Sequence, residues 1–200
     1  MLATHRGWDP GAWDTARYIA AQMNFPVYGC QTTRLLIETN RSRHNEQLFS
    51  EFTRPQNEAL KNELLTAIYH PYRDTIEQAI HALPGLVFHL SIHSFTPVLD
   101  GIRREADIGL LFDPARKNEV KFCQQYLPAL QNEWPHYTIR FNEPYKGTDD
   151  GFTTYLRTLF PDKRYCGIEL ELNQKFFEDQ EGKNLQLGLV RALKAMLKKF

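Results

Sequence analysis

Strict alternation of apolar and polar residues is clearest over residues 165–173. Three aliphatic side chains there face one way, and Glu169, Glu171 and Asn173 face the other, which predicts a β-strand. The apolar face and the adjacent Gly167 favour a strand inside a sheet. Carboxylates are rarely buried unless they are paired or bound to a cation. The two glutamates therefore suit either an edge strand in water or the wall of an active site.

A second alternating stretch covers residues 86–93 and ends in a polar turn. One face is apolar, while His89, Ser91 and His93 lie on the other. A histidine at the carboxyl end of an inner strand occupies the place where open α/β sheets bind ligands. His93 is therefore a candidate zinc ligand or general base, although a histidine buried in the core and bonded to a backbone carbonyl would fit the same pattern.

The remaining patterns alternate between helix and strand. Asp9 and Pro10 resemble a helix start, with Asp9 as the cap. Pro71 predicts a break or kink in a long helix. Helices are expected over residues 12–23, 56–83, 119–130, 151–160 and 185–200, and further strands over residues 26–28, 34–37, 107–112 and 137–141. This order predicts one α/β domain, residues 1–200, with three α/β/α layers around a mainly parallel or mixed sheet.

Composition narrows the possible partners. Lys and Arg together number 24, as do Asp and Glu, so the chain has no net charge to attract nucleic acid or an anionic membrane. No apolar run is long enough to span a bilayer. The three cysteines are widely spaced and unpatterned, which indicates reduced thiols and a cytoplasmic location. A small-molecule substrate is therefore the expected partner.

Polar residues in three loops are candidates for substrate binding. Asn40 and Arg41 follow a short apolar stretch, and a guanidinium with a neighbouring amide can hold a carboxylate. Arg104 follows the histidine turn, where it could also form a structural ion pair with Asp107. Tyr145 lies in a loop rich in turn residues. Each loop could equally be a plain connection.

Several of these motifs together, in this order, resemble the N-formylglutamate amidohydrolase family over nearly the whole chain. The segments that carry the resemblance are residues 5–12 (HRGWDPGA), 40–42 (NRS), 93–97 (HSFTP), 107–114 (DIGLLFDP), 142–147 (NEPYKG) and 167–171 (GIELE). The resemblance implies a fold similar to the zinc carboxypeptidases and to the aspartoacylase group.

The resemblance also implies roles for individual residues. Residues 91–94 resemble the segment that carries the last zinc-binding histidine, which is His93 here. Asn40 and Arg41 resemble the pair that holds a substrate carboxylate. The strand of Glu169 and Glu171 resembles the strand that bears the catalytic glutamate, and the spacing favours Glu171. Asp9 resembles an acidic position of the family, so it is a candidate second metal ligand as well as a candidate cap.

The sequence departs from the family pattern at its start. Family members are expected to begin with a strand ending in Glu-His or Pro-His, which supplies the first zinc ligand, whereas Trp8 here follows Met1 closely. The expectation is a late start assignment or a shortened form with an incomplete zinc site. Two functions stay open: a zinc-dependent amidohydrolase acting on an N-acylated acidic amino acid such as N-formylglutamate, and a non-catalytic carboxylate-binding protein on the same fold.

Overall fold

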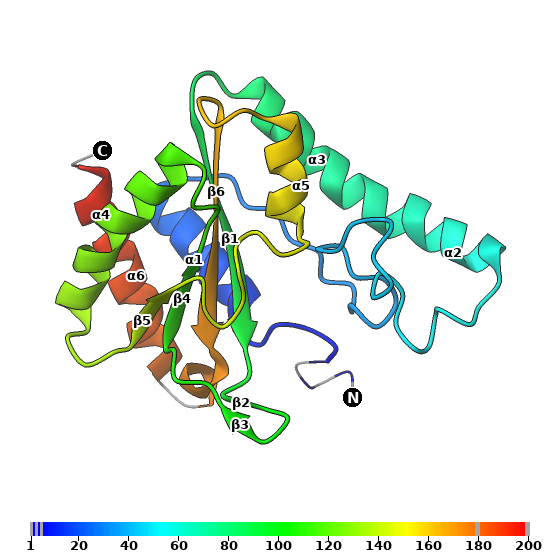
Figure 1. The fold of residues 1–200 in the computed structure, drawn as a ribbon, viewed down its shortest axis with the longest axis horizontal. Coiled ribbons are helices and arrows are strands. Elements are labelled where there is room, and N and C mark those ends of the chain that lie inside the picture. The colour runs from blue at the N-terminus through cyan, green and yellow to red at the C-terminus, as the bar shows by residue number, and fades with distance from the viewer. Residues whose placement is uncertain (1, 3, 5, 179–180, 199–200) are drawn as a thin grey trace.

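A four-stranded mixed sheet lies at the centre of the computed structural model, which describes residues 2, 4, 6–178 and 181–198 (Figure 1). The strands are β1 (Val87–Phe95), β4 (Ile108–Leu111), β5 (Ile139–Phe141) and β6 (Tyr165–Asn173), in the order β1-β6-β4-β5. Strand β1 runs parallel to β6, and β4 runs antiparallel to β6 and parallel to β5. The expected mixed α/β sheet is therefore present, with β6 as the predicted inner strand.

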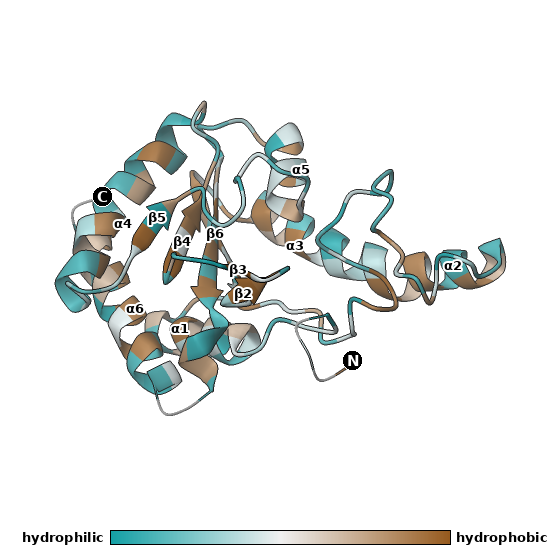
Figure 2. Ribbon diagram, turned by 60° about the horizontal axis from the view of Figure 1, so that its bottom comes forward, coloured by the Kyte–Doolittle hydropathy of each residue, from teal (hydrophilic) through white to brown (hydrophobic). Residues whose placement is uncertain are grey.

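Helices cover both faces of this sheet and make the expected three layers (Figures 1 and 2). One face packs against α1 (Ala12–Met23), α4 (Lys117–Glu133) and α6 (Glu181–Leu197) around the largest apolar cluster, which includes Ile168, Leu170 and Leu172. The other face packs against α3 (His70–Ala82) and α5 (Phe152–Leu159). Because side chains alternate along β6, Glu169 and Glu171 face the α3 and α5 layer.

Smaller elements complete the described chain. Helix α2 (Glu58–Leu64), the π-helical turn η1 (Leu65–Tyr69) and α3 form one long rod, and a third apolar cluster joins this rod to residues 37–49. The hairpin of β2 (Val98–Leu99) and β3 (Ile102–Arg103), which the sequence did not predict, follows β1, and the 3-10 turn η2 (Gln174–Phe177) follows β6. None of the helices in the described part of the chain is both long and apolar enough to cross a bilayer.

Several predicted elements are wrong in detail. Residues 26–28 and 34–37 form no strand; in the second stretch, Leu36 N donates to Thr33 O in a turn and Arg34 N donates to Gly7 O. Pro71 does not end the helical rod, but the regular α-helix is interrupted there: Pro71 is the second residue of α3, directly after the π turn, so the predicted break takes the form of a local distortion. Helix α6 begins four residues earlier than predicted, and the predicted residues 199 and 200 lie outside the described residues.

The position of β1 also differs from the prediction. The strand continues past His93 to Phe95, and it lies at the edge of the described sheet rather than inside it. Phe88, on its apolar face, is 39% exposed. An alternating pattern cannot distinguish an edge strand from an inner one when both of its faces are covered by helices, as they are here.

Candidate active site

His93 and Glu171 lie side by side where β1 and β6 approach their carboxyl ends. The register pairs His93 with Glu171 and Ser91 with Glu169, so the four side chains share one face of the sheet. Both glutamates are buried, at 9% and 5% exposure. The structure thus brings together the histidine and the carboxylates that the two alternating stretches marked as candidates.

Asp9 joins this group from the segment before α1. Its Oδ2 lies 2.8 Å from His93 Nδ1, and its Oδ1 accepts a hydrogen bond of 2.6 Å from Arg34. The prediction of Asp9 as a helix cap is wrong, because α1 begins at Ala12 and its cap position is Gly11, in the left-handed region at a φ of 77°. Asp9 therefore belongs to the candidate site.

Charge and burial shift the pKa values of these groups in opposite directions. Burial alone would lower the pKa of His93, but the hydrogen bond and charge of Asp9, with the charges of Glu171 and Glu169, raise it to about 9. Burial would raise the pKa of Asp9, but His93 and Arg34 hold it below its usual value. At neutral pH the pair is a partly buried ion pair of imidazolium and carboxylate.

Glu171 has the most unusual environment of these groups. Burial raises its pKa to about 7; the cations His93 and Arg34 oppose this rise, and Asp9 and Glu169 add to it. Its Oε2 atom is buried and has no hydrogen-bond partner. A buried, unpartnered carboxylate oxygen costs free energy, and such groups are concentrated at functional sites.

Glu169 lies on the same strand face but is held by neighbours. Its Oε1 accepts a short hydrogen bond from the hydroxyl of Thr153 in α5. A Cβ atom added at Gly151 would lie 3.2 Å from the same oxygen, so the start of α5 passes very close to this carboxylate. The two glutamates therefore differ: Glu169 is fixed by α5, whereas Glu171 keeps a free oxygen.

Arg34 is the main site residue that the sequence analysis missed. Its Nε lies 3.0 Å from Glu38, its Nη2 bonds Asp9, and its charge acts on Glu171. Glu38 also accepts a hydrogen bond of 3.2 Å from the backbone N–H of Asn40. In the sequence, this role is indicated only by the four-residue spacing of Arg34 and Glu38, which is typical of an ordinary ion pair. The contact of Arg34 with Asp9 depends on the tertiary fold and could not be predicted from this spacing.

The proposed carboxylate anchors Asn40 and Arg41 support the start of α5. Asn40 Oδ1 accepts a hydrogen bond of 2.8 Å from the N–H of Phe152, and Arg41 Nη1 donates to the carbonyl of Asp150. The buried guanidinium of Arg73 donates to the carbonyls of Thr39 and Arg41, at 3.1 and 3.3 Å. These bonds hold the loop beside Glu169, and Arg41 still has further N–H groups that could bind a ligand.

Arg104 and Tyr145 form a pair at the border of the site. Arg104 Nη2 donates to the Tyr145 hydroxyl at 2.9 Å, and its guanidinium lies 5.0 Å from the Tyr145 ring centre and 5.6 Å from that of Phe95. Tyr145 also acts electrostatically on Arg34. The predicted ion pair with Asp107 is wrong, because Asp107 pairs with Lys175.

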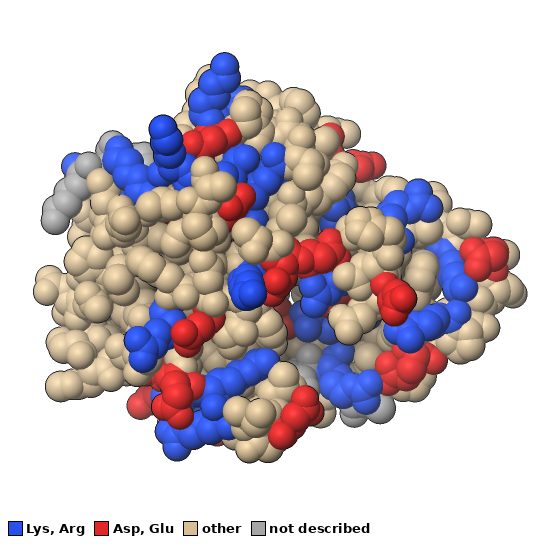
Figure 3. Space-filling model, viewed as in Figure 1, with Lys and Arg blue, Asp and Glu red and all other residues tan. Residues whose placement is uncertain are grey.

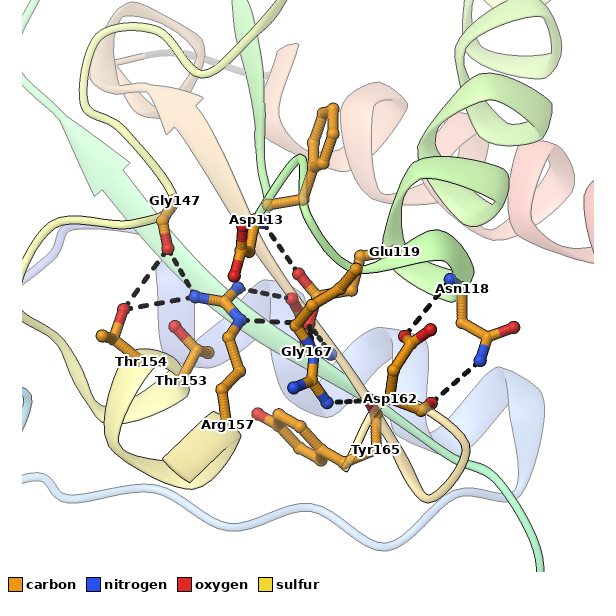
Figure 4. Close-up of polar contacts among 12 residues, drawn as sticks. Asp113, Asn118, Glu119, Gly147, Thr153, Thr154, Arg157, Asp162, Tyr165 and Gly167 are labelled. Carbon is orange, nitrogen blue, oxygen red and sulfur yellow. Dashed lines mark hydrogen bonds and ion pairs between the residues drawn. The ribbon is translucent and has the colours of Figure 1, made fainter. Parts of the chain in front are cut away.

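A buried ionic network supports these elements from the amino end of β6 (Figure 4). The carboxylate of Glu119, fully buried, lies 3.0 Å from Arg157 Nε and accepts a hydrogen bond of 3.2 Å from Gly167 N. Arg157 in turn donates to the carbonyl of Gly147, in the loop that carries Tyr145, and to that of Gly167 at 2.9 Å. The network thus connects α4, α5, β6 and the Tyr145 loop.

The donor atoms of the described residues do not make up a catalytic zinc site. His93 Nδ1 is bonded to Asp9, and its Nε2 lies 3.1 Å from the hydroxyl of Ser91. No group of three or more His, Cys, Asp or Glu side chains in the described part of the chain could hold a metal ion. The expected pair of ligands, His93 and Asp9, is present, but as partners of each other.

Charged side chains of both signs surround a hollow near the middle of the face in Figure 3. No extended area of a single charge covers this face, which agrees with the balanced composition. The three cysteines are free thiols, and Cys123 and Cys166 are buried.

Comparison with known proteins gives a family and a fold. Two solved structures match closely in shape. Gene product Atu2144 from Agrobacterium tumefaciens has a TM-score of 0.76 and 25% identity, covering 98% of this chain and 81% of that one. N-formylglutamate amidohydrolase from Ralstonia eutropha JMP134 has a TM-score of 0.64 and 15% identity, covering 94% and 83%. A metallo-carboxypeptidase from Burkholderia cenocepacia has a TM-score of 0.44 and 14% identity, covering 65% and 35%.

No curated protein matches the sequence significantly. A family model described as N-formylglutamate amidohydrolase matches residues 2–177, which include every candidate site residue from Asp9 to Glu171. From this match over most of its length, the chain belongs to the N-formylglutamate amidohydrolase family.

Proposed function

We propose that the chain is a hydrolase that cleaves the amide bond of an N-acylated acidic amino acid, with N-formylglutamate as the first candidate. The observation that carries this proposal is Glu171, a buried carboxyl with a pKa of about 7 and an oxygen without a partner. A general base is most effective when its pKa lies near the working pH. Family membership supports the same class of reaction and a small-molecule substrate.

Glu171 would take a proton from a water molecule as the water oxygen attacks the acyl carbon. The cations that act on Glu171 are Arg34 and His93, which is protonated below its pKa of about 9. They would stabilise the negative charge that develops on the acyl oxygen. Glu171 would then return the proton to the leaving nitrogen, so that formate and the free amino acid are released and the base is restored.

Four residues around the site are proposed to bind the carboxylates of the substrate. Arg41 and Asn40 lie beside Glu169, and Arg104 and Tyr145 lie at the border. A guanidinium binds a carboxylate through two parallel hydrogen bonds, which suits a dicarboxylic amino acid. Tyr145 is 41% exposed, so part of its side chain is accessible from outside.

The zinc expected from the family resemblance is given no step in this proposal. The described residues offer one imidazole and neighbouring carboxylates, fewer than the three well-placed ligands that a catalytic zinc takes from protein. The same observation favours a second candidate function, in which the protein binds carboxylates on this fold without hydrolysing them. Both functions predict that the protein binds an N-acylated acidic amino acid, but only the first predicts that it hydrolyses this molecule.

Incubation with N-formyl-L-glutamate, with detection of both formate and glutamate, tests the proposal. Hydrolysis that depends on Glu171 is the expected result. Saturable binding of N-formyl-L-glutamate without release of formate would favour the binding function, and the absence of both binding and release would overturn both proposals.

A further inference from the structure

Arg73 is a buried cation on an apolar helix face, and it takes no part in the proposed reaction. The buried side chains of α3 are Arg73, Ile76 and Ile80, whose spacing places them on one face of the helix. Arg73 is only 4% exposed, and in the described part of the chain its hydrogen bonds go to backbone carbonyls rather than to a carboxylate. Burial of a cation costs free energy unless other contacts compensate for it. The contacts of Arg73 therefore indicate why a cation stands at this position.

The guanidinium of Arg73 binds the backbone on both sides of the pair Asn40 and Arg41. Its Nη1 lies 3.1 Å from the carbonyl oxygen of Thr39 and 3.3 Å from that of Arg41. The hydroxyl of Tyr69, one turn earlier on the same rod, donates to the same Arg41 carbonyl at 2.8 Å. The backbone of the two proposed carboxylate anchors is thus fixed against the helical rod.

Three aromatic rings enclose the same guanidinium. Its Cζ lies 4.2 Å from the ring centre of Phe152, 4.4 Å from that of Tyr155 and 4.8 Å from that of Tyr69. A guanidinium at such distances is attracted by the ring. Phe152 and Tyr155 belong to the first turn of α5, and the N–H of Phe152 donates to Asn40 Oδ1. Arg73 therefore contacts both the anchor loop and the helix start to which Asn40 is bonded.

We propose that Arg73 is a positioning residue, which sets the geometry of Asn40 and Arg41 and thereby the affinity of the site for a substrate carboxylate. This inference rests on the proposed function. Arg73 acts through the two anchors and not by contact with the substrate, because carbonyls and rings surround its guanidinium. A planar guanidinium can donate to two carbonyls while its faces lie against rings, whereas the ammonium group of a lysine offers no such plane.

Kinetics of Arg73→Lys with N-formyl-L-glutamate test the proposal. The variant keeps the charge but loses the plane, so KM should rise at least about tenfold while kcat changes less than about threefold, the pattern of lost substrate binding. Calorimetric titration with N-formyl-L-glutamate should show the same loss of affinity. Urea unfolding shows separately how much stability the variant loses.

Amide hydrogen exchange of Phe152, followed by NMR without substrate, gives a second readout. The Phe152 amide should exchange at least about tenfold faster in Arg73→Lys, because the loop that carries its acceptor Asn40 is held less firmly. The amide of Gly167, which is bonded to Glu119, is the internal reference and should keep its rate. Tyr155→Leu, a milder change that removes one ring from the enclosure, should shift the affinity and the Phe152 rate in the same directions by smaller factors.

Arg164 provides the matched control at the other end of α3. It donates to the carbonyl of Ile80 at 2.7 Å, so it also holds backbone carbonyls, but away from the anchors. Arg164→Lys should lower the stability in urea and leave KM and the Phe152 exchange rate unchanged.

Three outcomes decide the proposal. Unchanged KM and unchanged Phe152 exchange in Arg73→Lys, even with lower stability, would overturn it and leave Arg73 a structural residue. If Arg73→Lys does not fold, Tyr155→Leu takes its place, and wild-type values of both readouts in that variant would overturn the proposal. If the wild type neither binds nor hydrolyses N-formyl-L-glutamate, the proposed function fails, and the exchange of Phe152 alone decides whether Arg73 positions the loop.

Discussion

At the scale of single residues, two carboxylates on one strand face have different environments. Glu169 is held by Thr153 and crowded by Gly151, whereas Glu171 has an unpartnered oxygen and a pKa raised to about 7. The strand pattern alone left the choice of base between them open. Their surroundings in the fold favour Glu171, in agreement with the assignment that the resemblance implied.

The first prediction compares these two residues. Glu171→Gln keeps the shape of the side chain but removes the base, so it should lower turnover of N-formyl-L-glutamate by about 10²–10⁴. Glu169→Gln should cost less, because Thr153 can still bond the amide oxygen. Circular dichroism checks that both variants fold. A larger loss in Glu169→Gln would identify Glu169 as the base, and equal activity of all three proteins would remove both glutamates from the mechanism.

The second prediction concerns the pair of Asp9 and His93. Asp9→Asn removes the negative charge of Asp9, which, with its hydrogen bond, does most to raise the pKa of His93. This pKa should therefore fall from about 9, because the burial of His93, which lowers the pKa, is then opposed less strongly. Titration of the His93 ring signals by NMR measures the change. Asp14→Asn, on the exposed face of α1, is the control and should leave the titration as it is. An unchanged titration in Asp9→Asn would show that the pair does not form.

At the scale of elements, the start of α5 and the loop of residues 38–43 hold each other beside β6. Asn40 bonds the N–H of Phe152, and Arg41 bonds the carbonyl of Asp150. The amino end of β6 is held by the buried pair of Glu119 and Arg157 (Figure 4). These contacts join segments that are far apart in the sequence, so no local pattern could reveal them.

The third prediction tests Arg41 as a carboxylate anchor. A lysine at this position keeps the positive charge but lacks the planar guanidinium group. It therefore cannot donate to the carbonyl of Asp150 and also bind a substrate carboxylate through two parallel hydrogen bonds. Arg41→Lys should therefore weaken binding of N-formyl-L-glutamate by roughly tenfold, about 1.4 kcal/mol. Calorimetric titration measures this, with Arg43→Lys, exposed in the same loop, as the control. Equal affinities of wild type and Arg41→Lys would leave Arg41 with a structural role only.

The fourth prediction tests the ionic network. Arg157→Met removes one of the cations that contact the buried carboxylate of Glu119. The loss of this partner should lower the free energy of unfolding by about 3–5 kcal/mol. Arg191, whose pair with Glu133 is exposed, gives the matched control: Arg191→Met should change stability little. Urea unfolding of both variants compares them. A small effect of Arg157→Met would show that Arg116, 3.1 Å from the same carboxylate, is sufficient.

At the scale of the whole molecule, the site lies where β1 and β6 meet the loops that carry Asp9, Arg34 and Tyr145. The sheet order places β6 in the interior, so its apolar face packs under α4 and α6 while its glutamates face the thinner layer of α3 and α5. A cavity of about 1040 Å³ has Asp9, Arg34 and His93 in its lining, so it borders the candidate site.

The fifth prediction concerns metal content. Residues 1–200 should bind zinc weakly, because His93 is paired with Asp9 and the described donors form no group of three. Elemental analysis of the purified chain should show clearly less than one zinc per molecule after mild chelation. Stoichiometric zinc that survives dialysis would contradict this, and it would show that residues outside this pairing complete a site.

Much of the architecture followed from local patterns. Alternation over residues 165–173 and 86–93 predicted both strands and the faces of His93 and the glutamates, because the period of a strand is a property of the backbone itself. The same patterns failed for residues 26–28 and 34–37, where a few apolar residues in a row do not distinguish a strand from a loop.

Only the tertiary structure decided which residues meet at the site. Asp9 and His93 are 84 positions apart, and the contact between Arg34 and Asp9 spans 25. The partners of Glu169, the free oxygen of Glu171 and the edge position of β1 depend likewise on how distant segments pack. Periodicity reports which way a side chain points, whereas its neighbours, its burial and hence its pKa come from contacts made by the folded chain.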